Sequence, residues 1–550
     1  MSGGEAVVRA LAANGVRVVF GIPGTHNLPI YDHLTSYGIT HVTTRHEQGA
    51  GYAADAFARV TGQVGVVVTT TGPALLNAAA AAGQSYSDSV PVLVVSPGMP
   101  LIHPGTFAGE LHEAKDQQAA MAGVVAHSRR ASCPADADAL VAQCIASCTA
   151  GRPRPEHLEI PLDVLASEGA VPAQPALAPR QPAMVPDPDL VTLGASLLAS
   201  ARRPGLVLGG GARGARSALA SLAERLGALV VTSANGKGVI PETHPLSLGV
   251  GLHLARVQRW LAECDVVLAV GTELAASDFW REPPRVGGRL VRIDVDPAQM
   301  VRAQRADVAL VGDAAAYAEA LVKELATAAA TGATATTAEE ATATEDAGAT
   351  AAASPRFVVD DVRAECRAEA AALGARWQPF LDVVRRSCPA DTIFTSDSAM
   401  ACYYGALGNL AISEEGRFLH PTGFGTLGYA LPAAVGAGVA APDRPVVALS
   451  GDGGFQFSLQ ELGTASALGR PIVVIVFDNG GYGEIRAEME ARPGQAPLGV
   501  DLASPDLVHL AAAYGQHGVV AESPGTLATS LTEALSRLCV TLIQVPEPTR

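Results

Sequence analysis

Short apolar runs alternate with helical stretches along most of the chain, and this alternation predicts its secondary structure. In the first third of the sequence, four such runs are strand candidates, at residues 16–20, 64–69, 91–96 and 156–162. The run at 64–69 is almost entirely apolar, which is typical of a strand buried on both faces. Strands separated by helices pair in parallel, so this part of the chain predicts a doubly wound parallel sheet.

The same alternation returns twice further along the chain. The strand candidates of a second unit are residues 204–208, 229–232, 266–270 and 290–295. Those of a third unit include residues 445–449 and 472–477. The predicted fold class is therefore α/β, with three doubly wound parallel-sheet domains.

Two stretches that offer no apolar face separate these units. Residues 171–189 are rich in proline and alanine, which favours an extended linker. Residues 326–354 are almost entirely Ala, Thr, Gly and Glu, which favours a flexible linker. The predicted order is an N-terminal domain at 1–168, a linker at 169–189, a central domain at 190–325, a flexible linker at 326–356 and a C-terminal domain at 357–550.

Polar turns follow both strands of the third unit. A GDG motif at residues 451–453 follows the first strand, and Asn479 follows the second, 26 residues after the motif. Such turns lie at the carboxyl ends of parallel strands, where open α/β sheets bind ligands. The oxygens of Asp452 and Asn479 suit Mg²⁺ or Ca²⁺, and glycines let backbone N–H groups approach a phosphate. The pattern predicts a metal-bridged diphosphate, although GDG without Asn479 would more simply be an ordinary turn.

A candidate catalytic carboxylate lies near the N-terminus. Glu47 belongs to the segment TRHEQGA at residues 44–50, which opens a helical pattern. Taken alone, Glu47 is more simply explained as an acidic residue of a first helical turn, where it complements the helix dipole. The spacing of GDG and Asn479 resembles the thiamine-diphosphate motif, and this changes that balance, because thiamine chemistry needs one partly desolvated carboxylate beside the pyrimidine ring of the cofactor.

Four motifs in sequence order then identify a resemblance. They are GVRVVFGIPG at 15–24, RHEQGAGYAADAFARVTG at 45–62, HPTGFGTLGYALPAAVGAG at 420–438 and the GDG motif with its downstream asparagine. Over nearly its whole length the chain resembles the thiamine-diphosphate enzymes of the acetolactate synthase, pyruvate oxidase and 2-oxo acid decarboxylase type. The resemblance implies a pyrimidine-binding first domain, a Rossmann-like central domain and a diphosphate-binding third domain similar to the first.

The resemblance also implies a role for each matched residue. Glu47 would activate the cofactor by a hydrogen bond to N1′, which promotes the imino tautomer whose N4′ removes the C2 proton. Leu427 would support the bent cofactor, although it is equally a core leucine at a helix start. The implied metal ligands are Asp452, Asn479 and the carbonyl of Gly481. The other implied cofactor-binding residues are Asn77, Gly453, Gly454 and Gly425, whose carbonyl would accept a hydrogen bond from N4′.

Two side chains are candidates for directing the fate of the enamine that decarboxylation leaves. Thr25 stands where simple decarboxylases of the family carry Asp or Ser, and its hydroxyl is suited to binding the substrate carboxylate or relaying a proton. Thr25 is equally a candidate cap of the helix that follows it. His112 stands where carboligases carry Phe-Gln, and an imidazole is a plausible proton donor to the enamine. The alternative for His112 is a surface histidine.

The central unit raises the question of a second cofactor. Several members of the family bind FAD there, and the segments at 208–212 (LGGGA) and 292–297 (RIDVDP) would suit a nucleotide. Both features also occur in members without flavin, so we expect no FAD. The loop at 72–74 is Gly-Pro-Ala where the family usually has Gly-Pro-Gly, which leaves its path open.

Composition narrows the partners and the compartment. A net charge of −16 over 550 residues argues against nucleic acid and against an anionic membrane surface as partners. The eight cysteines form no CxxC pair and are typical of a reducing compartment. Because no signal peptide and no apolar run of about 18 residues is found, we expect a cytoplasmic protein.

The resemblance finally implies an assembly and a reaction. In the family the cofactor lies between the first domain of one subunit and the third domain of another, so we expect at least a homodimer, with dimer or tetramer left open. The polar Thr25 and His112 favour non-oxidative decarboxylation of a 2-oxo acid, with carboligation as a possible side reaction; guanidino-oxo acid decarboxylase is one such type. The alternatives are an acetolactate-synthase-like carboligase with FAD and a catalytically silent regulatory or binding subunit.

Overall fold

The structure is a computed structural model, and it describes residues 1–103, 107–179, 184–282, 285–331, 359–494 and 496–547. By its contacts the chain forms two compact units. Met1–Pro182 and Gly374–Arg550 together make the first unit, and Ala183–Leu373 makes the second. Most of the stretch predicted as a flexible linker, and residues 180–183 of the other predicted linker, lie outside the described residues.

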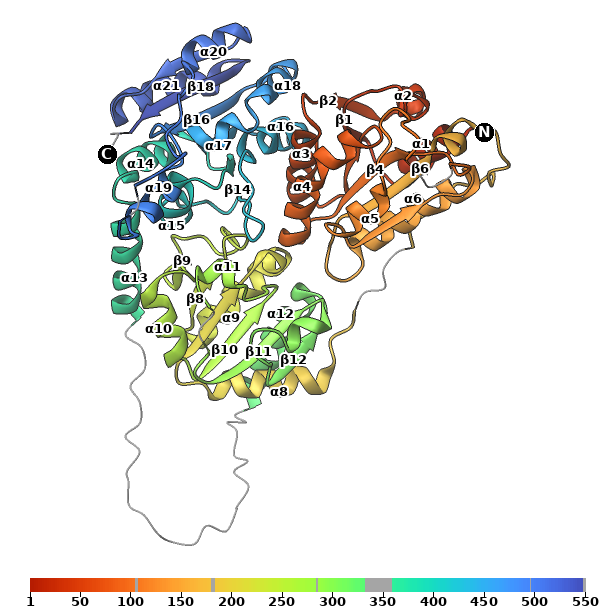
Figure 1. Ribbon diagram of the computed structural model, residues 1–550. Helices are drawn as coiled ribbons and strands as arrows, with labels where there is room; N and C mark the ends of the chain where they lie inside the picture. Colours follow the sequence, from red (N-terminus) through yellow and green to blue (C-terminus); the bar gives the residue numbers. More distant parts are fainter. Residues whose placement is uncertain (104–106, 180–183, 283–284, 332–358, 495, 548–550) are drawn as a thin grey trace, which may run out of the picture. The chain divides into compact units, whose positions relative to one another are not determined.

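Each of the three sheets in the described residues has six strands, and all of their strand pairs are parallel (Figure 1). The first contains β1 (Val18–Gly21), β2 (Thr40–Thr43), β3 (Gly65–Val68), β4 (Val92–Gly98), β5 (His127–Arg130) and β6 (Glu156–Pro161), in the order β2-β1-β3-β4-β6-β5. The second contains β7 (Pro204–Leu208), β8 (Leu229–Thr232), β9 (Ser247–Val250), β10 (Val266–Val270), β11 (Arg289–Asp294) and β12 (Val308–Val311), in the order β12-β11-β10-β7-β8-β9. The third contains β13 (Ile393–Ser396), β14 (Arg417–Leu419), β15 (Val446–Gly451), β16 (Ile472–Asp478), β17 (His517–Val520) and β18 (Val540–Pro546), in the order β14-β13-β15-β16-β18-β17. The predicted α/β class with three parallel sheets is confirmed.

Helices connect these strands in both units. In the N-terminal part of the first unit they are α1 (Gly3–Ala13), α2 (Leu28–Leu34), α3 (Glu47–Thr61), α4 (Pro73–Asp88), α5 (Gln117–Ala122), α6 (Pro134–Thr149) and α7 (Leu162–Ala166). In its C-terminal part they are α14 (Gln378–Ser387), α15 (Leu407–Asn409), α16 (Ala430–Ala440), α17 (Asp452–Gln456), α18 (Leu462–Ala467), α19 (Gly483–Glu490), α20 (Leu507–Ala513) and α21 (Pro524–Ser536). The second unit has α8 (Pro188–Ser200), α9 (Arg216–Leu226), α10 (Ala255–Glu263), α11 (Ala276–Phe279), α12 (Ala314–Thr331) and α13 (Val359–Gly374). A π-helical turn, η4 (Ala401–Ala406), and 3₁₀ turns including η5 (Leu459–Glu461) complete the elements used below.

Helices α3 and α16 join the two sheets of the first unit into one core. Both helices are rich in small residues, and a single hydrophobic cluster contains the buried side chains of both together with strands of both sheets. Gly436 packs against the Ala53 carbonyl so closely that any side chain there would overlap it. Small side chains therefore allow the helix backbones to approach, which fixes the N-terminal sheet against the C-terminal one.

Helix α13 illustrates why the domain boundaries stay predictions. The sequence places it at the start of the C-terminal domain, yet its Val362 and Cys366 pack in a hydrophobic cluster with strands of the second unit. Among the described helices, none combines the length and the apolar character that crossing a bilayer requires.

Candidate active site

Glu47 occupies the first position of α3, immediately after the turn that follows β2. Its Oε2 accepts a hydrogen bond of 3.0 Å from Nδ2 of Asn77, which projects from α4. The phenol of Tyr31 lies near enough that its pKa is raised, first by burial and then by the Glu47 charge. The structure thus brings together Glu47 and Asn77, two residues that the sequence predicted to lie at the cofactor. Their roles stay predictions.

The capping alternative for Thr25 is wrong. Helix α2 begins at Leu28 with Asn27 as its N-cap residue, and Thr25 lies exposed two positions before that. The buried Asn27 stabilises the preceding turn instead, because its side chain accepts from the Gly24 N–H at 2.8 Å and donates to the Ile22 carbonyl at 3.0 Å. The Thr25 hydroxyl is therefore left available for another partner.

His112 is not an ordinary surface histidine. Its ring packs edge-on against His26, the neighbour of Thr25, with ring centroids 5.2 Å apart. Its Nδ1 is buried and, within the described residues, has no hydrogen-bond partner. Burial, followed by the charge of His112, lowers the pKa of His26, while Glu110 opposes this. The two imidazoles therefore lie together, and Nδ1 of His26 also pairs with the Thr71 hydroxyl at 3.0 Å.

The path of the Gly-Pro-Ala loop is now defined. Gly72 has a positive φ of 65°, which favours glycine, and Pro73 is the first residue of α4. The carbonyl of His112 packs on Gly72 so tightly that any side chain there would overlap it. Gly72 thereby brings the His112 segment to the N-terminal end of the helix that carries Asn77.

The predicted metal ligands converge at the ends of β15 and β16. The Asp452 Oδ1 accepts from the backbone N–H of Asn479 at 3.3 Å. The Oδ1 of Asn479 is buried and has no partner in the described residues. The Gly481 carbonyl oxygen lies 3.4 Å from the position that a Gly453 side chain would occupy, so it borders the GDG turn. A carboxylate, an orphaned amide oxygen and a carbonyl are a donor set that fits a hard divalent cation.

Two neighbouring carboxylates at the proposed metal site also favour a cation there. Asp478 lies beside Asp452, and the Ser504 hydroxyl donates to Asp452 at 3.2 Å and to Asp478 at 3.0 Å. Burial, followed by the Asp478 charge, raises the pKa of Asp452. Within the described residues, no group of three or more His, Cys, Asp or Glu side chains is arranged as a metal site. The proposed set instead combines one carboxylate with neutral oxygens.

A second buried carboxylate, which the sequence analysis missed, contacts Gly428 and the predicted cofactor-binding residue Gly454. Asp397 follows β13 and accepts the Gly428 N–H at 2.9 and 3.1 Å, and the Ser450 hydroxyl donates to it at 3.0 Å. Burial raises its pKa to about 6, and these hydrogen bonds oppose the rise. A side chain on Gly454 would come within 2.9 Å of Asp397, which explains why a glycine stands there. The available signal was its place at the carboxyl end of a strand neighbouring β15.

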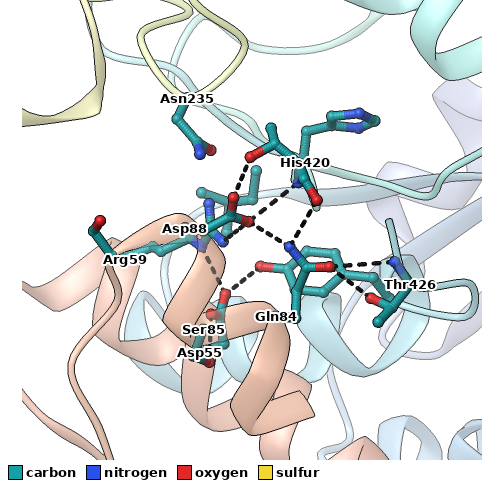
Figure 2. A network of polar contacts seen from close by, with 12 residues as sticks. Asp55, Arg59, Gln84, Ser85, Asp88, Asn235, His420 and Thr426 are labelled. Atoms are coloured by element: carbon teal, nitrogen blue, oxygen red, sulfur yellow. Dashed lines mark hydrogen bonds and ion pairs between the residues drawn. The ribbon is translucent and has the colours of Figure 1, made fainter. Parts of the chain in front are cut away.

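Helix α4 holds the loop that contains Gly425 and Leu427 (Figure 2). Oε1 of Gln84 accepts from the N–H and the hydroxyl of Thr426 at 3.2 and 2.9 Å, and its Nε2 donates to the Thr422 carbonyl at 3.2 Å. Asp88, one turn on, accepts from the Thr422 N–H at 3.2 Å. The loop is therefore fixed on both sides of Gly425.

Buried charges hold α4 in the position from which it binds this loop (Figure 2). Arg59 of α3 donates to Asp55 at 2.6 Å and to Asp88 at 2.7 Å, and both carboxylates are fully buried. Ser85 and Tyr429 donate to Asp55 at 2.8 and 2.7 Å. A buried cation with two satisfied anions ties α3, α4 and α16 together, and removing one member would leave an uncompensated charge.

Leu427 is half-buried, whereas Gly425 is exposed and adopts a left-handed conformation at φ 67°. The space beside Gly425 is open, since no atom lies within 4 Å of the position of a side chain there. The loop is thus exposed at Gly425 and held by hydrogen bonds on both sides of it. This arrangement fits the predicted contact between the Gly425 carbonyl and the cofactor.

Three family models of thiamine pyrophosphate enzymes match the chain, in the order of the domains. The N-terminal thiamine pyrophosphate (TPP) binding domain matches residues 1–121, the central domain matches residues 192–321, and the C-terminal TPP binding domain matches residues 399–545.

Several known proteins are similar over almost the full chain. A probable 2-ketoarginine decarboxylase of Pseudomonas aeruginosa is 43% identical over 518 residues, covering 94% of this chain and 88% of that protein. A probable acetolactate synthase large subunit of Methanocaldococcus jannaschii is 32% identical, covering 97% and 90%. The large subunit of acetolactate synthase isozyme 3 of Escherichia coli is 30% identical, covering 98% and 93%. Together with the three parallel sheets, these matches show that the chain belongs to the thiamine pyrophosphate enzyme family.

Proposed function

We propose that this protein catalyses the non-oxidative decarboxylation of a 2-oxo acid with thiamine diphosphate and a divalent metal ion. The observation that supports this most strongly is the 43% identity to a probable 2-ketoarginine decarboxylase over nearly all of both chains. The pair formed by His112 and His26, which follows Thr25 in the chain, supports the same reaction, because imidazoles can donate and accept protons and the His112 carbonyl packs on Gly72, at the start of the helix that carries Asn77.

In this proposal Asp452, Asn479 and the Gly481 carbonyl would hold the metal, and the backbone at Gly453 and Gly454 would bind the diphosphate. When bound, thiamine diphosphate supplies the electron sink that loss of carbon dioxide from a 2-oxo acid requires. The chain's own contribution is to place a carboxyl group, Glu47, where it holds a proton at N1′ of the pyrimidine ring.

We further propose that the working site needs two copies of the chain. The described contacts join Glu47 to Asn77 and Asp452 to Asn479, but none of them joins the first pair to the second. Large apolar side chains close in sequence to predicted site residues are exposed: Leu76, Leu111, Phe424 and Phe457 are between 46% and 63% exposed. A second copy that covers these side chains would bring Glu47 of one subunit to the metal site of the other.

His112 is the proposed proton donor that ends the reaction as an aldehyde. In His112→Ala, aldehyde formation from 2-ketoarginine is expected to fall about 100-fold, the typical contribution of a general acid. The measurement is product analysis over a panel of 2-oxo acids, with and without a carbonyl acceptor. The matched control is His509→Ala, which removes an exposed imidazole on α20.

A second candidate function comes from the acetolactate synthase relatives, which are 30% to 32% identical over the same length. A carboligase of that kind would condense two pyruvates, and a flavin band in the visible spectrum of the purified protein would favour it. Acetolactate as the main product from pyruvate, at a rate that His112→Ala leaves unchanged, would overturn the decarboxylase proposal.

A guanidino side chain on the substrate requires a carboxylate partner, and Glu484 is our candidate. It lies in the first turn of α19, three residues after Gly481, and Oε1 accepts from the Tyr404 hydroxyl at 2.8 Å. The preceding Gly483 packs against Asn479, since a side chain at Gly483 would come within 2.6 Å of the Asn479 amide nitrogen. The backbone just before Glu484 therefore lies against a proposed metal ligand, while its carboxylate is held by Tyr404.

Glu484→Gln is expected to raise KM for 2-ketoarginine at least about tenfold, since a charge-assisted hydrogen bond to a guanidinium is lost. KM for an uncharged 2-oxo acid should change little. Steady-state kinetics with both substrates checks this, and Glu488→Gln, one turn further along α19, is the control. Equal changes in KM for the two substrates would assign Glu484 a structural role only.

A further inference from the structure

We propose that Glu461 is a positioning residue for Glu47, and that its carboxylate sets the place of Glu47 by binding the backbone of the turn before it. This inference rests on the proposed catalytic role of Glu47. Glu461 ends η5, nine residues after Asp452, and belongs to the C-terminal part of the first unit. The two glutamates are 414 positions apart in the sequence, so nothing in the local pattern around either one indicates the link.

The Glu461 carboxylate is fully buried and accepts hydrogen bonds from two consecutive backbone N–H groups. The N–H of His46 donates to Oε1 at 2.9 Å, and the N–H of Arg45 donates to both oxygens at 3.1 and 3.2 Å. Thr464 donates its hydroxyl to Oε2 at 2.5 Å. These two N–H groups directly precede the first residue of α3, so the position of Glu47 follows from theirs.

Gly49 makes room for this arrangement. A side chain at Gly49 would overlap Oε1 of Glu461 and would lie 2.9 Å from its Cγ. Because Gly49 is in the first turn of α3, the Glu461 carboxyl group sits directly against the start of that helix. The first turn of α3 can therefore pack against this carboxylate only because residue 49 is a glycine.

Chemistry explains why an ionised carboxyl group suits this place. The N–H groups at a helix start lack partners within the helix, and the helix dipole favours a negative charge there. A carboxylate offers acceptors on both oxygens, whereas a glutamine would turn its NH₂ group either toward the Arg45 and His46 N–H groups or toward the Arg45 N–H and the Thr464 hydroxyl. Burial raises the pKa of Glu461, and the hydrogen bonds from Thr464, Arg45 and His46 oppose that rise.

The first test uses the protein without cofactor. Amide hydrogen exchange, followed by mass spectrometry of the peptide that spans residues 43–50, reports on the Arg45 and His46 N–H groups. Glu461→Ala is expected to speed exchange of these amides at least about tenfold, because their shared acceptor is gone. The control is Glu156→Ala, which removes another fully buried carboxylate, at the edge pairing of β5 and β6. Unchanged protection in Glu461→Ala would overturn the proposal.

The second test measures activation of the cofactor in the loaded enzyme. At saturating thiamine diphosphate and magnesium, Glu461→Ala is expected to slow hydrogen–deuterium exchange at C2 between about 10-fold and 100-fold, since small misplacements of a catalytic group have effects of this size. Glu461→Gln should lie between Glu461→Ala and the unaltered protein. Should Glu461→Ala fail to fold, Thr464→Val removes only the third donor and should give a smaller change in the same direction.

A double variant separates this inference from the role of Glu47. Once Glu47→Gln has removed the carboxylate, adding Glu461→Ala should slow C2 exchange no further, because Glu461 acts only through Glu47. Equal effects of Glu461→Ala with and without Glu47 would refute the positioning role. Normal C2 exchange in Glu47→Gln itself would instead remove the proposed function on which the inference rests.

Discussion

Glu47→Gln is expected to lower turnover between about 100-fold and 10,000-fold, the range typical of a general acid or base. The amide keeps the shape of the side chain and can still pair with Nδ2 of Asn77 through its oxygen. It cannot exchange a proton with N1′, so C2 of the bound cofactor should lose its proton slowly. Cofactor affinity should change little, because the proposed diphosphate and metal contacts come from the C-terminal part of the first unit.

The measurements are steady-state decarboxylation and C2 hydrogen–deuterium exchange, each at saturating cofactor. Glu263→Gln, an exposed glutamate at the end of α10, is the control for loss of one negative charge. Near-normal turnover in Glu47→Gln would remove Glu47 from the mechanism. C2 exchange that is absent in the unaltered protein would instead support the rival interpretation, a catalytically silent subunit that has kept the fold.

The central strands could be predicted from the sequence because burial on both faces gives nearly continuous apolar runs. The predicted ranges for β7, β8 and β10 agree with the structure, and β15 and β16 differ by two residues or fewer at each end. The two edge strands of the first sheet were missed for the opposite reason. β5 reads His-Ser-Arg-Arg and β2 reads Thr-His-Val-Thr, and such polar strands lack the apolar signal.

The residues of the candidate site also differ in whether an apolar strand precedes them. Asp452 and Asn479 could be predicted because each follows an apolar strand, and parallel strands end at one edge. Asp397 follows a strand in the same way and was missed because that strand was not predicted, whereas Glu461 is a lone acidic residue whose partners are distant in sequence. Asn27 was overlooked because its side chain stabilises the turn before α2, which local capping rules do not anticipate. Long-range hydrogen bonds to backbone groups leave no periodic pattern.

Asp452→Ala is expected to weaken binding of thiamine diphosphate more than about 100-fold. Losing a residue that only hydrogen-bonds to a metal ligand typically lowers metal affinity about 10-fold to 100-fold, and losing a direct ligand should lower it further. The diphosphate would then face Asp478 with no metal bound between them. Removing the divalent metal from the unaltered protein with a chelator should release the cofactor in the same way. Titration calorimetry with and without magnesium checks both expectations.

Asp501→Ala is the matched control, because Asp501 pairs with the backbone of Gly481 in the same loop but is exposed and pairs its carboxylate with Arg486. Its cofactor affinity should stay close to that of the unaltered protein. A metal-free preparation that held thiamine diphosphate at ordinary affinity would rule out Asp452, Asn479 and Gly481 as a bridge to the diphosphate.

The two inactive variants together test whether one site draws on two subunits. Glu47→Gln and Asp452→Ala each destroy both sites of a homodimer. In a hybrid of the two, one site would receive both lesions and the other would receive an unaltered Glu47 and an unaltered Asp452. With random pairing, half of the dimers are hybrids and each has one intact site, so co-expression should restore about one quarter of normal activity.

No recovery in hybrids purified by two different tags would mean that Glu47 and Asp452 of the same subunit serve one site. Recovery near one quarter would require the partner's contribution, because neither parent dimer contains an intact site.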